Sequence, residues 1–328
     1  MTTHKLVSVF TIFAMFVVMA NANGLTLDYY KYSCPDAEAI TKRITDQYVG
    51  HVPNFAPGLL RMHFHDCIVR GCDASVLLDP TPSNNKTEKD SIPNSTLRGF
   101  EVINAIKGAL EEKCPGIVSC ADILSLAARD AIVKINGPYW HVPLGRKDGI
   151  ISLASEALAN IPSPFSNFTT LKQNFAAVGL SSKDLVVLSG AHTIGIGHCF
   201  IIQSRLYNFT GKGDTDPKLA PSYAKWLKTR CPKVVGDVKS FVYMDRITPK
   251  AFDEKYYTMV TQHRGLFESD AALLDDSETK NYIETQVYTQ GETFPKDFAE
   301  SITRMSLIGV LTGSQGQVRK TCGAVNYY

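Results

Sequence analysis

The stretch RMHFHDCIVRGCDAS, residues 61–75, places two histidines, two arginines, two aspartates and two cysteines close together. If the preceding residues begin a helix near Pro57, Arg61 and His65 lie four apart and share a face, while His63 points elsewhere. A neutral imidazole accepts a proton near neutral pH, and a guanidinium is a permanent cation. The pair could therefore deprotonate a small substrate and stabilise the negative charge that develops.

A zinc site is the alternative use of the two histidines. Zinc ligands on a helix need a spacing of three or four, which His63 and His65 do not have, but on a strand the two would face the same way. A secreted zinc or other metal hydrolase that uses His63, His65 and Asp66 therefore stays open, as does the plain interpretation of a surface arginine and a core histidine.

The second half of the stretch is rich in hard oxygen ligands. Asp66, Asp73 and Ser75 flank a glycine-containing loop, and main-chain carbonyls could complete the six to eight oxygens that Ca²⁺ takes. A bridge between Cys67 and Cys72 would close this loop. The spacing is not that of an EF-hand, but it indicates a calcium site.

Other candidate residues lie further along the chain. His192 stands at the end of a predicted helix in SGAHTIG, and MDRITPKAFD offers Asp245, Thr248 and Asp253 as oxygen ligands. Asp270 lies in the apolar stretch LFESDAALL, where a carboxylate needs a partner such as a histidine nitrogen. Spacing alone does not join Asp270 to His192.

The elements that must position these residues are helices. Apolar residues recur at helical spacing in residues 36–52, 98–114, 119–135, 181–195 and 294–311. In the first of these, Ala39, Ile40, Ile44 and Val49 are expected on one buried side. Residues 181–184 form a capping-box pattern before an apolar run. Strand signals are short and few, so the sequence predicts a mainly α protein.

The first residues resemble a secretory signal. Lys5 is followed by an apolar run over residues 6–19 and then by Ala20-Asn21-Ala22, which predicts a signal peptide over residues 1–22. The run is too short to span a bilayer, so we expect no membrane association of the mature chain, residues 23–328. That chain carries 33 basic against 32 acidic residues, which offers no field for nucleic acid.

The cysteines and sequons agree with export. An even number of cysteines in an exported chain predicts disulfides, and no C-x-x-C metal motif occurs; the eight are Cys34, Cys67, Cys72, Cys114, Cys120, Cys199, Cys231 and Cys322. Their spacing does not give the pairing. Asn85, Asn167 and Asn208 begin glycosylation sequons, and Asn94 begins a fourth.

Over its mature length the chain resembles the plant secretory (class III) haem peroxidases. The resemblance is carried, in family order, by RMHFHDCIVRGCDASVLLD, KCPGIVSCADILSLAARD, VPLGRKDG, DLVVLSGAHTIG, SRLYNF, FDEKYY and LFESD. It implies a haem-dependent peroxidase fold, with haem b held between a distal lobe near residues 24–165 and a proximal lobe near 166–328. It also implies a monomer that reduces H2O2 and oxidises phenolic or other small aromatic donors.

The resemblance assigns roles around the haem. His65 becomes the distal acid and base, Arg61 its charge-stabilising partner, and Asn94 the group that hydrogen-bonds the other nitrogen of His65. Asn94 would then be buried and its sequon unused. Phe64 would crowd the distal face and steer donors toward the haem edge.

The remaining roles follow in the same way. His192 becomes the iron ligand, Asp270 its carboxylate partner, and Pro162 a contact for aromatic donors. Asp122 and Arg146 would form a buried ion pair.

Two calcium sites and four disulfides are implied as well. The distal calcium set is Asp66, Val69, Gly71, Asp73, Ser75 and Glu88, with Val69 and Gly71 contributing main-chain oxygens and Glu88 acting through water. The proximal set is Thr193, Asp245, Thr248, Ala251 and Asp253, with Ala251 contributing its carbonyl. The implied pairs are Cys34–Cys114, Cys67–Cys72, Cys120–Cys322 and Cys199–Cys231.

Some positions depart from the family pattern. Ile68, Ile194 and Met244 stand where aromatic residues are usual, Phe200 replaces a basic residue, and PNSTLRGF is one residue short. These departures leave donor preference open among lignin precursors, other phenolics, auxin and wall-protein tyrosines. The short C-terminal tail favours the extracellular space or cell wall over the vacuole. A non-catalytic, calcium-bound wall protein of the same fold is the alternative function.

Overall fold

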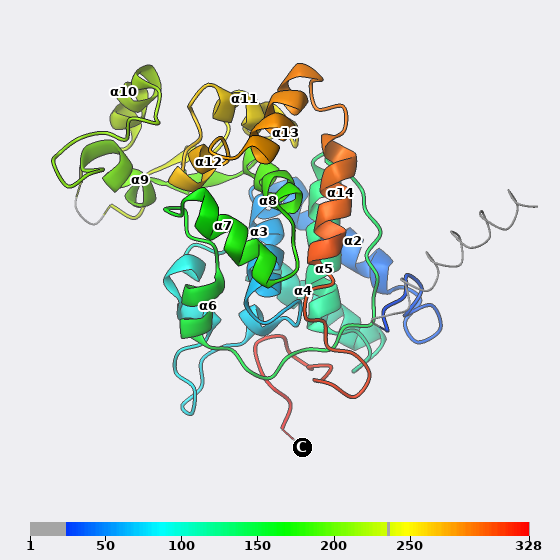
Figure 1. The fold of residues 1–328 in the computed structure, drawn as a ribbon. Coiled ribbons are helices and arrows are strands. Elements are labelled where there is room, and N and C mark those ends of the chain that lie inside the picture. The colour runs from blue at the N-terminus through cyan, green and yellow to red at the C-terminus, as the bar shows by residue number, and fades with distance from the viewer. Residues whose placement is uncertain (1–23, 235–236, 328) are drawn as a thin grey trace, which may run out of the picture.

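The computed structural model describes residues 24–234 and 237–327, so the predicted signal peptide lies outside the described residues. Within these ranges the chain forms thirteen α-helices, four short 3-10 helices and one sheet of two antiparallel strands (Figure 1). The prediction of a mainly α protein is confirmed.

The helices and strands have the following bounds. The α-helices are α2 (Ala37–His51), α3 (Phe55–Val69), α4 (Phe100–Lys113), α5 (Cys120–Lys134), α6 (Ala154–Asn160), α7 (Phe168–Ala177), α8 (Ser182–Ser189), α9 (Cys199–Tyr207), α10 (Pro221–Arg230), α11 (Lys255–Thr261), α12 (Glu268–Ala272), α13 (Ser277–Tyr288) and α14 (Phe294–Met305). The 3-10 helices are η1 (Ser75–Leu77), η2 (Glu88–Asp90), η3 (Ile92–Asn94) and η4 (Gly190–Thr193), and the strands are β1 (Ile196–His198) and β2 (Phe241–Tyr243).

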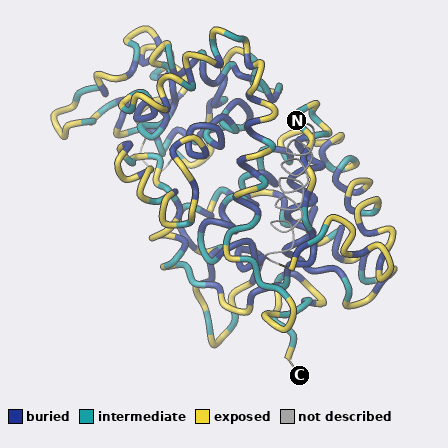
Figure 2. The backbone as a smooth tube through the Cα atoms, turned by 45° about the vertical axis from the view of Figure 1, so that its right-hand side comes forward, coloured by how far each residue is buried: buried dark blue, intermediate teal, exposed yellow. Residues whose placement is uncertain are grey.

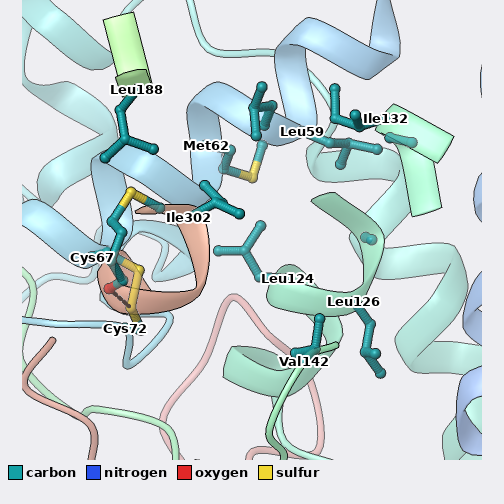
Figure 3. Packing of buried hydrophobic residues seen from close by; sticks show 14 of the residues in the cluster. Leu59, Met62, Cys67, Cys72, Leu124, Leu126, Ile132, Val142, Leu188 and Ile302 are labelled. Atoms are coloured by element: carbon teal, nitrogen blue, oxygen red, sulfur yellow. Dashed lines mark hydrogen bonds between the residues drawn. A yellow bond between two sulfur atoms is a disulfide. The ribbon is translucent and has the colours of Figure 1, made fainter. Parts of the chain in front are cut away.

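The core is built around α5. Its residues are buried without a break from Cys120 to Ile132, as expected for a helix surrounded by protein on all sides. Helices α2, α3 and α4 pack against it. Figure 3 shows Leu59 and Met62 of α3 near Leu124 of α5, and burial of each such side chain stabilises the fold by about 1.5–3 kcal/mol.

The predicted buried face of α2 is partly wrong. Ala39 is exposed and Ile40 only partly buried, and the residues that face the core are Ala37, Thr41, Ile44, Thr45 and Val49. The hydroxyl of Thr41 donates to the carbonyl of Ala37 at 2.9 Å, which satisfies a polar group inside the core. The pattern of apolar residues alone did not predict that Thr41 and Thr45 face the core.

The chain turns sharply after α3. Gly71 has φ 97°, and a Cβ at this position would lie 2.6 Å from the Cα of Gly309. Only glycine allows both the left-handed backbone and this close approach. The amide of Cys72 then donates to the carbonyl of Ile308 at 2.9 Å, so the oxygen-rich loop rests against the C-terminal part of the chain.

Covalent and ionic links tie distant segments together. The four expected disulfides are all formed: Cys34–Cys114, Cys67–Cys72, Cys120–Cys322 and Cys199–Cys231. The expected ion pair is also present, because Arg146 Nη1 lies 2.9 Å from Asp122 Oδ1 with both side chains fully buried. Arg146 Nη2 further donates to the carbonyl of Ser306 at 2.7 Å.

A second, smaller apolar cluster lies under α9 and α10, at the edge of the molecule in Figure 1. The main core instead contains residues from both expected lobes, and Figure 2 shows its buried chain segments running through the interior. The division into lobes at residue 165 therefore stays a prediction. No helix within the described ranges is long and apolar enough to cross a membrane.

Candidate active site

Helix α3 and the turn η3 bring His65 and Asn94 together. The Nδ1 of His65 lies 2.6 Å from Asn94 Oδ1, and both residues are buried. Asn94 Nδ2 donates to the carbonyl of Glu88 at 2.8 Å, which fixes the orientation of the amide. Since Asn94 then presents its oxygen, we assign the proton of His65 to Nδ1, so Nε2 is unprotonated and can accept a hydrogen bond.

Arg61 lies one helical turn before His65 and faces the same way. Its Nε is 3.2 Å from His65 Nε2, while Nη1 donates to Thr96 Oγ1 at 2.8 Å and Nη2 to the carbonyl of Pro93 at 2.7 Å. The shared face of Arg61 and His65 is confirmed. Thr96 and Pro93 as anchors of the guanidinium were missed, although both belong to the segment around Asn94.

The surroundings set the charge state of this pair. Burial lowers the pKa of His65 well below its usual value, the Arg61 cation lowers it further, and the bond to Asn94 partly offsets both effects. Burial, helped by the Arg98 cation, lowers the pKa of Arg61 to about 10. Near neutral pH the site therefore holds a neutral base beside a cation.

Phe64 lies beside the distal pair, whereas no contact joins Pro162 to it among the described residues. The ring of Phe64 meets the ring of His65 edge-on at a centroid distance of 5.8 Å and lies 6.3 Å from the ring of Phe175. Pro162 follows α6 and is partly buried. Its loop is attached to α12 because the amide of Ser269 donates to the carbonyl of Pro164 at 3.0 Å.

His192 and Asp270, 78 residues apart in sequence, also meet. His192 Nδ1 lies 2.8 Å from Asp270 Oδ1, which also accepts from the hydroxyl of Tyr256 at 2.8 Å. Asp270 Oδ2 accepts from the amide of Phe267 at 2.8 Å. Burial raises the pKa of Asp270, but His192 and these hydrogen bonds bring it below its usual value, so the group is a carboxylate. The role of Tyr256 was missed, although FDEKYY contains it.

Local structure fixes His192 in place. Helix α8 begins with the predicted capping box between Ser181 and Asp184 and continues into η4, which carries His192. A Cβ at Gly190 would lie 2.5 Å from the Tyr257 hydroxyl oxygen and from the Phe294 ring, so the turn packs tightly on both. The absence of a side chain at Gly190 is what permits this contact.

The imidazole of His192 fits an iron ligand. Asp270 occupies Nδ1, and no hydrogen bond to Nε2 occurs within the described ranges. The side chain is 38% exposed although its neighbour Thr193 is fully buried. A histidine that is oriented by a carboxylate on one nitrogen and uncovered on the other is the arrangement that haem proteins use for a proximal ligand.

His63 does not take part in this site. It is buried, its Nδ1 lies 3.6 Å from Cys67 Sγ, and burial lowers its pKa to about 3. His65 instead contacts Arg61 and Asn94. The helical geometry thus separates the two histidines, and a zinc site built on both is not supported.

The residues predicted for the distal calcium site form a buried group of charges. The amide of Ala74 donates to Asp66 Oδ2 at 2.9 Å and that of Ser75 to Asp73 Oδ1 at 2.9 Å. Neither carboxylate oxygen of Glu88 nor the Ser75 hydroxyl has a hydrogen-bond partner within the described part of the chain. Burial raises the pKa of Asp66 well above its usual value, with repulsion from Asp73 and Glu88 adding to it.

Main-chain oxygens of this set are close by. The carbonyl of Gly71 accepts from the amide of Asp73 at 2.8 Å, and that of Val69 lies 3.5 Å from Asn160 Nδ2. Three buried carboxylates, of which Glu88 has both oxygens without a hydrogen-bond partner among the described residues, fit a hard divalent cation, which would neutralise their repulsion.

The proximal calcium residues also converge. The hydroxyl of Thr193 lies 3.1 Å from Asp253 Oδ1, 3.4 Å from the carbonyl of Ala251 and 3.5 Å from Asp245 Oδ2. Thr248 Oγ1 lies 2.9 Å from Asp253 Oδ1 and 3.1 Å from Asp245 Oδ2. Across residues 24–234 and 237–327, no group of three or more His, Cys, Asp or Glu side chains is positioned to hold a metal by itself. A cation at either predicted set would therefore need hydroxyl and main-chain oxygens as well.

The residues that depart from the family pattern are mostly internal. Ile68, Ile194 and Met244 are buried, whereas Phe200 is partly buried with its ring 5.7 Å from the ring of His198. None of the four takes part in the hydrogen bonds that orient His65 and His192.

Comparison with known proteins decides the family. A model of the peroxidase family matches residues 38–288. The chain belongs to the peroxidase family. Peroxidase 1 and Peroxidase 56 of Arabidopsis thaliana are each 53% identical to it, over 92% and 93% of this chain and 92% of each relative. Peroxidase 1 of Oryza sativa subsp. japonica is 48% identical over 94% of this chain and 95% of its own length.

These findings confirm the resemblance to class III plant peroxidases and the expected fold and enzyme class. The peroxidase is an oxidoreductase that uses H2O2 and a reducing donor, and its family works with a haem cofactor. Nothing found favours the non-catalytic alternative.

Proposed function

We propose that this peroxidase is a secreted, monomeric enzyme of the extracellular space or cell wall that binds haem b and two Ca²⁺. It reduces H2O2 and oxidises phenolic or other small aromatic donors one electron at a time. The predicted leader and sequons support secretion, and the set of plant relatives agrees with it.

One observation carries the proposal. Two histidines each have Nδ1 fixed by a buried partner, Asn94 for His65 and Asp270 for His192. The other nitrogen, Nε2, accepts from Arg61 in His65 and has no hydrogen-bond partner among the described residues in His192. Arg61 adds a cation beside the first of them only. This asymmetry supports a base on the distal side and a metal ligand on the proximal side.

The chain's own groups perform the proton steps. His65 Nε2 takes a proton from bound H2O2 and gives it to the oxygen that leaves as water, while Nδ1–H stays bonded to Asn94. Arg61 stabilises the negative charge that develops as the O–O bond breaks, an effect of about 10²–10³-fold for such a placed group. His192 would hold the iron of a bound haem, and Asp270 would strengthen it as a ligand. When bound, the haem supplies the electron-transfer chemistry.

Phe64 and Pro162 would border the path of the aromatic donor, and calcium would hold both histidine segments. Glu88 links the distal set to the site, since its carbonyl accepts from Asn94. Thr193 links the proximal set, since it follows His192 directly.

The test is the absorption spectrum of the secreted protein before and after one equivalent of H2O2. We expect a ferric haem Soret band that shifts with peroxide and recovers when guaiacol is added. His192→Ala should lose haem or turnover, whereas His51→Ala, at an exposed histidine on α2, should not. A protein that binds no haem when haem and calcium are supplied would refute the proposal.

A further inference from the structure

A line of tyrosines runs from His192 to the surface of the protein. The ring of Tyr256 lies 5.7 Å from the ring of His192, Tyr257 lies 5.4 Å from Tyr256, and Tyr282 lies 5.8 Å from Tyr257, between ring centroids. Tyr256 and Tyr257 are almost fully buried on α11, and Tyr282 is partly exposed on α13, which packs beside α11 (Figure 1).

The direction of this line is set by chemistry as well as by distance. Tyr257 also meets Phe294 at 5.3 Å. A phenylalanine ring has no hydroxyl and is much harder to oxidise than a phenol, so this branch is closed to an electron hole. Electron tunnelling falls steeply with distance, and rings in van der Waals contact exchange electrons readily. The easiest path from Tyr257 therefore leads to Tyr282.

The far end of the line has a proton acceptor, which a tyrosine needs in order to lose an electron at low cost. The hydroxyl of Tyr282 donates to Asp297 Oδ2 at 3.0 Å. Lys183 donates to Asp297 Oδ1 at 2.7 Å and Thr293 to Oδ2 at 2.8 Å. Partial burial raises the pKa of Asp297, but these bonds bring it below its usual value. Asp297 is therefore a carboxylate that can accept the proton of Tyr282.

We propose that Tyr256, Tyr257 and Tyr282 carry single oxidising equivalents from the haem side to the surface, where Tyr282 oxidises phenol groups borne by polymers too large to enter the haem pocket. The inference rests on the proposed function, because peroxide turnover supplies the oxidant. The distal residues His65 and Asn94 are buried, whereas Tyr282 is partly exposed on α13.

The electrons and protons balance in two steps. Tyr282 first loses one electron, which passes through Tyr257 and Tyr256 to the oxidised centre, and its hydroxyl proton moves to Asp297. A polymer-borne phenol then gives one hydrogen atom to the Tyr282 phenoxyl, which restores the tyrosine and leaves a phenoxyl radical on the polymer. Asp297 releases its proton to water.

Radical trapping in the holoenzyme tests the path. A nitroso spin trap is added with H2O2 in the absence of donor, and the labelled tyrosine is located by peptide mass spectrometry. We expect label at Tyr282 in the wild type and its loss in Tyr257→Phe, which keeps the ring and its packing but removes the hydroxyl. Tyr288→Phe removes an 89% exposed tyrosine of the same helix and should leave the label unchanged.

Undiminished label at Tyr282 in Tyr257→Phe would overturn the path, as would no label there in the wild type. The surface activity is tested with phenol-conjugated dextran as donor. We expect Tyr282→Phe to lose most of this oxidation while guaiacol is still oxidised, and Tyr288→Phe to keep both. If Tyr282→Phe lost the oxidation of both donors equally, or of neither, the proposed surface site would be refuted. A wild type that does not oxidise guaiacol would instead refute the proposed function.

Discussion

The imidazole of His65 and the amide of Asn94 meet at 2.6 Å although the residues are 29 positions apart. The same amide donates to the carbonyl of Glu88, whose carboxylate belongs to the predicted distal calcium set. The base is therefore oriented by a side chain that is itself held by the calcium segment. The predicted base and the predicted calcium set therefore share one structural element, the stretch from η2 to η3.

Replacing Asn94 should slow the reaction with peroxide. In Asn94→Ala the His65 Nδ1–H loses its acceptor, so the tautomer with a free Nε2 is no longer favoured and the ring is no longer held. Loss of such a partner costs about 10–100-fold in rate. Stopped-flow measurement of the Soret change with H2O2 reports this step. Asn281→Ala, at an exposed position on α13, is the control, and equal rates in the two variants would contradict the prediction.

The four sequons should differ in occupancy. Asn94 is 3% exposed and its amide is engaged at both ends, so it is inaccessible once the chain has folded. Asn85, Asn167 and Asn208 are exposed. Glycopeptide mass spectrometry of the secreted protein should find glycan at these three and none at Asn94. A glycan on Asn94 would show that this segment is placed differently.

Contacts within one helix could be predicted from the sequence. Arg61 and His65 are four residues apart, and helical geometry alone brings them together. The pairs His65–Asn94 and His192–Asp270 cross between elements, and no periodicity encodes such a meeting. They were expected only because the motifs resembled a family.

Other features could not be predicted from the sequence, for identifiable physical reasons. Thr41 is buried because a local hydrogen bond satisfies its hydroxyl, which a hydrophobicity pattern cannot register. Thr96, Pro93 and Tyr256 act through hydrogen bonds to the site residues, and their positions depend on how α3, η3, α11 and α12 pack. Such contacts follow from tertiary structure.

Calcium removal should make the protein less stable as pH rises. Without a cation, burial raises the pKa of Glu88 from 4.5 to about 8, and repulsion from Asp73 contributes. Between these values the folded state holds a proton that the unfolded state has released, so the calcium-free protein loses stability as pH rises. Bound calcium would stabilise the ionised carboxylate of Glu88 and so remove this loss of stability at high pH. The increase in Tm on adding calcium should therefore be several degrees larger at pH 8 than at pH 5.

Differential scanning calorimetry in EDTA and in CaCl2 at both pH values gives the comparison. Glu88→Gln is the matched variant, since it keeps the shape and removes one titrating group, and its calcium-free Tm should change less between pH 5 and pH 8. A calcium-free wild type that is more stable at pH 8 than at pH 5 would contradict the predicted sign.

The buried ion pair between Asp122 and Arg146 should matter far more than an exposed one. Asp122 accepts from Arg146 Nη1 at 2.9 Å, from the hydroxyl of Tyr30 at 2.7 Å and from the amide of Gly145 at 2.7 Å. Asp122→Ala leaves a buried guanidinium uncompensated, which should lower the free energy of unfolding by about 3–5 kcal/mol. The loss arises because Arg146 cannot reach water while it remains bonded to the carbonyl of Ser306.

An exposed pair on α13 supplies the control. Lys280 and Glu284 lie 3.9 Å apart with both side chains more than half exposed. Glu284→Ala should change the free energy of unfolding by no more than about 0.5 kcal/mol, because solvent screens the pair. Guanidinium unfolding with the disulfides intact measures both variants. If Asp122→Ala lowered the free energy of unfolding as little as Glu284→Ala does, the prediction would be wrong. The hydrogen-bond network around Asp122 would then stabilise the fold no more than a surface ion pair does.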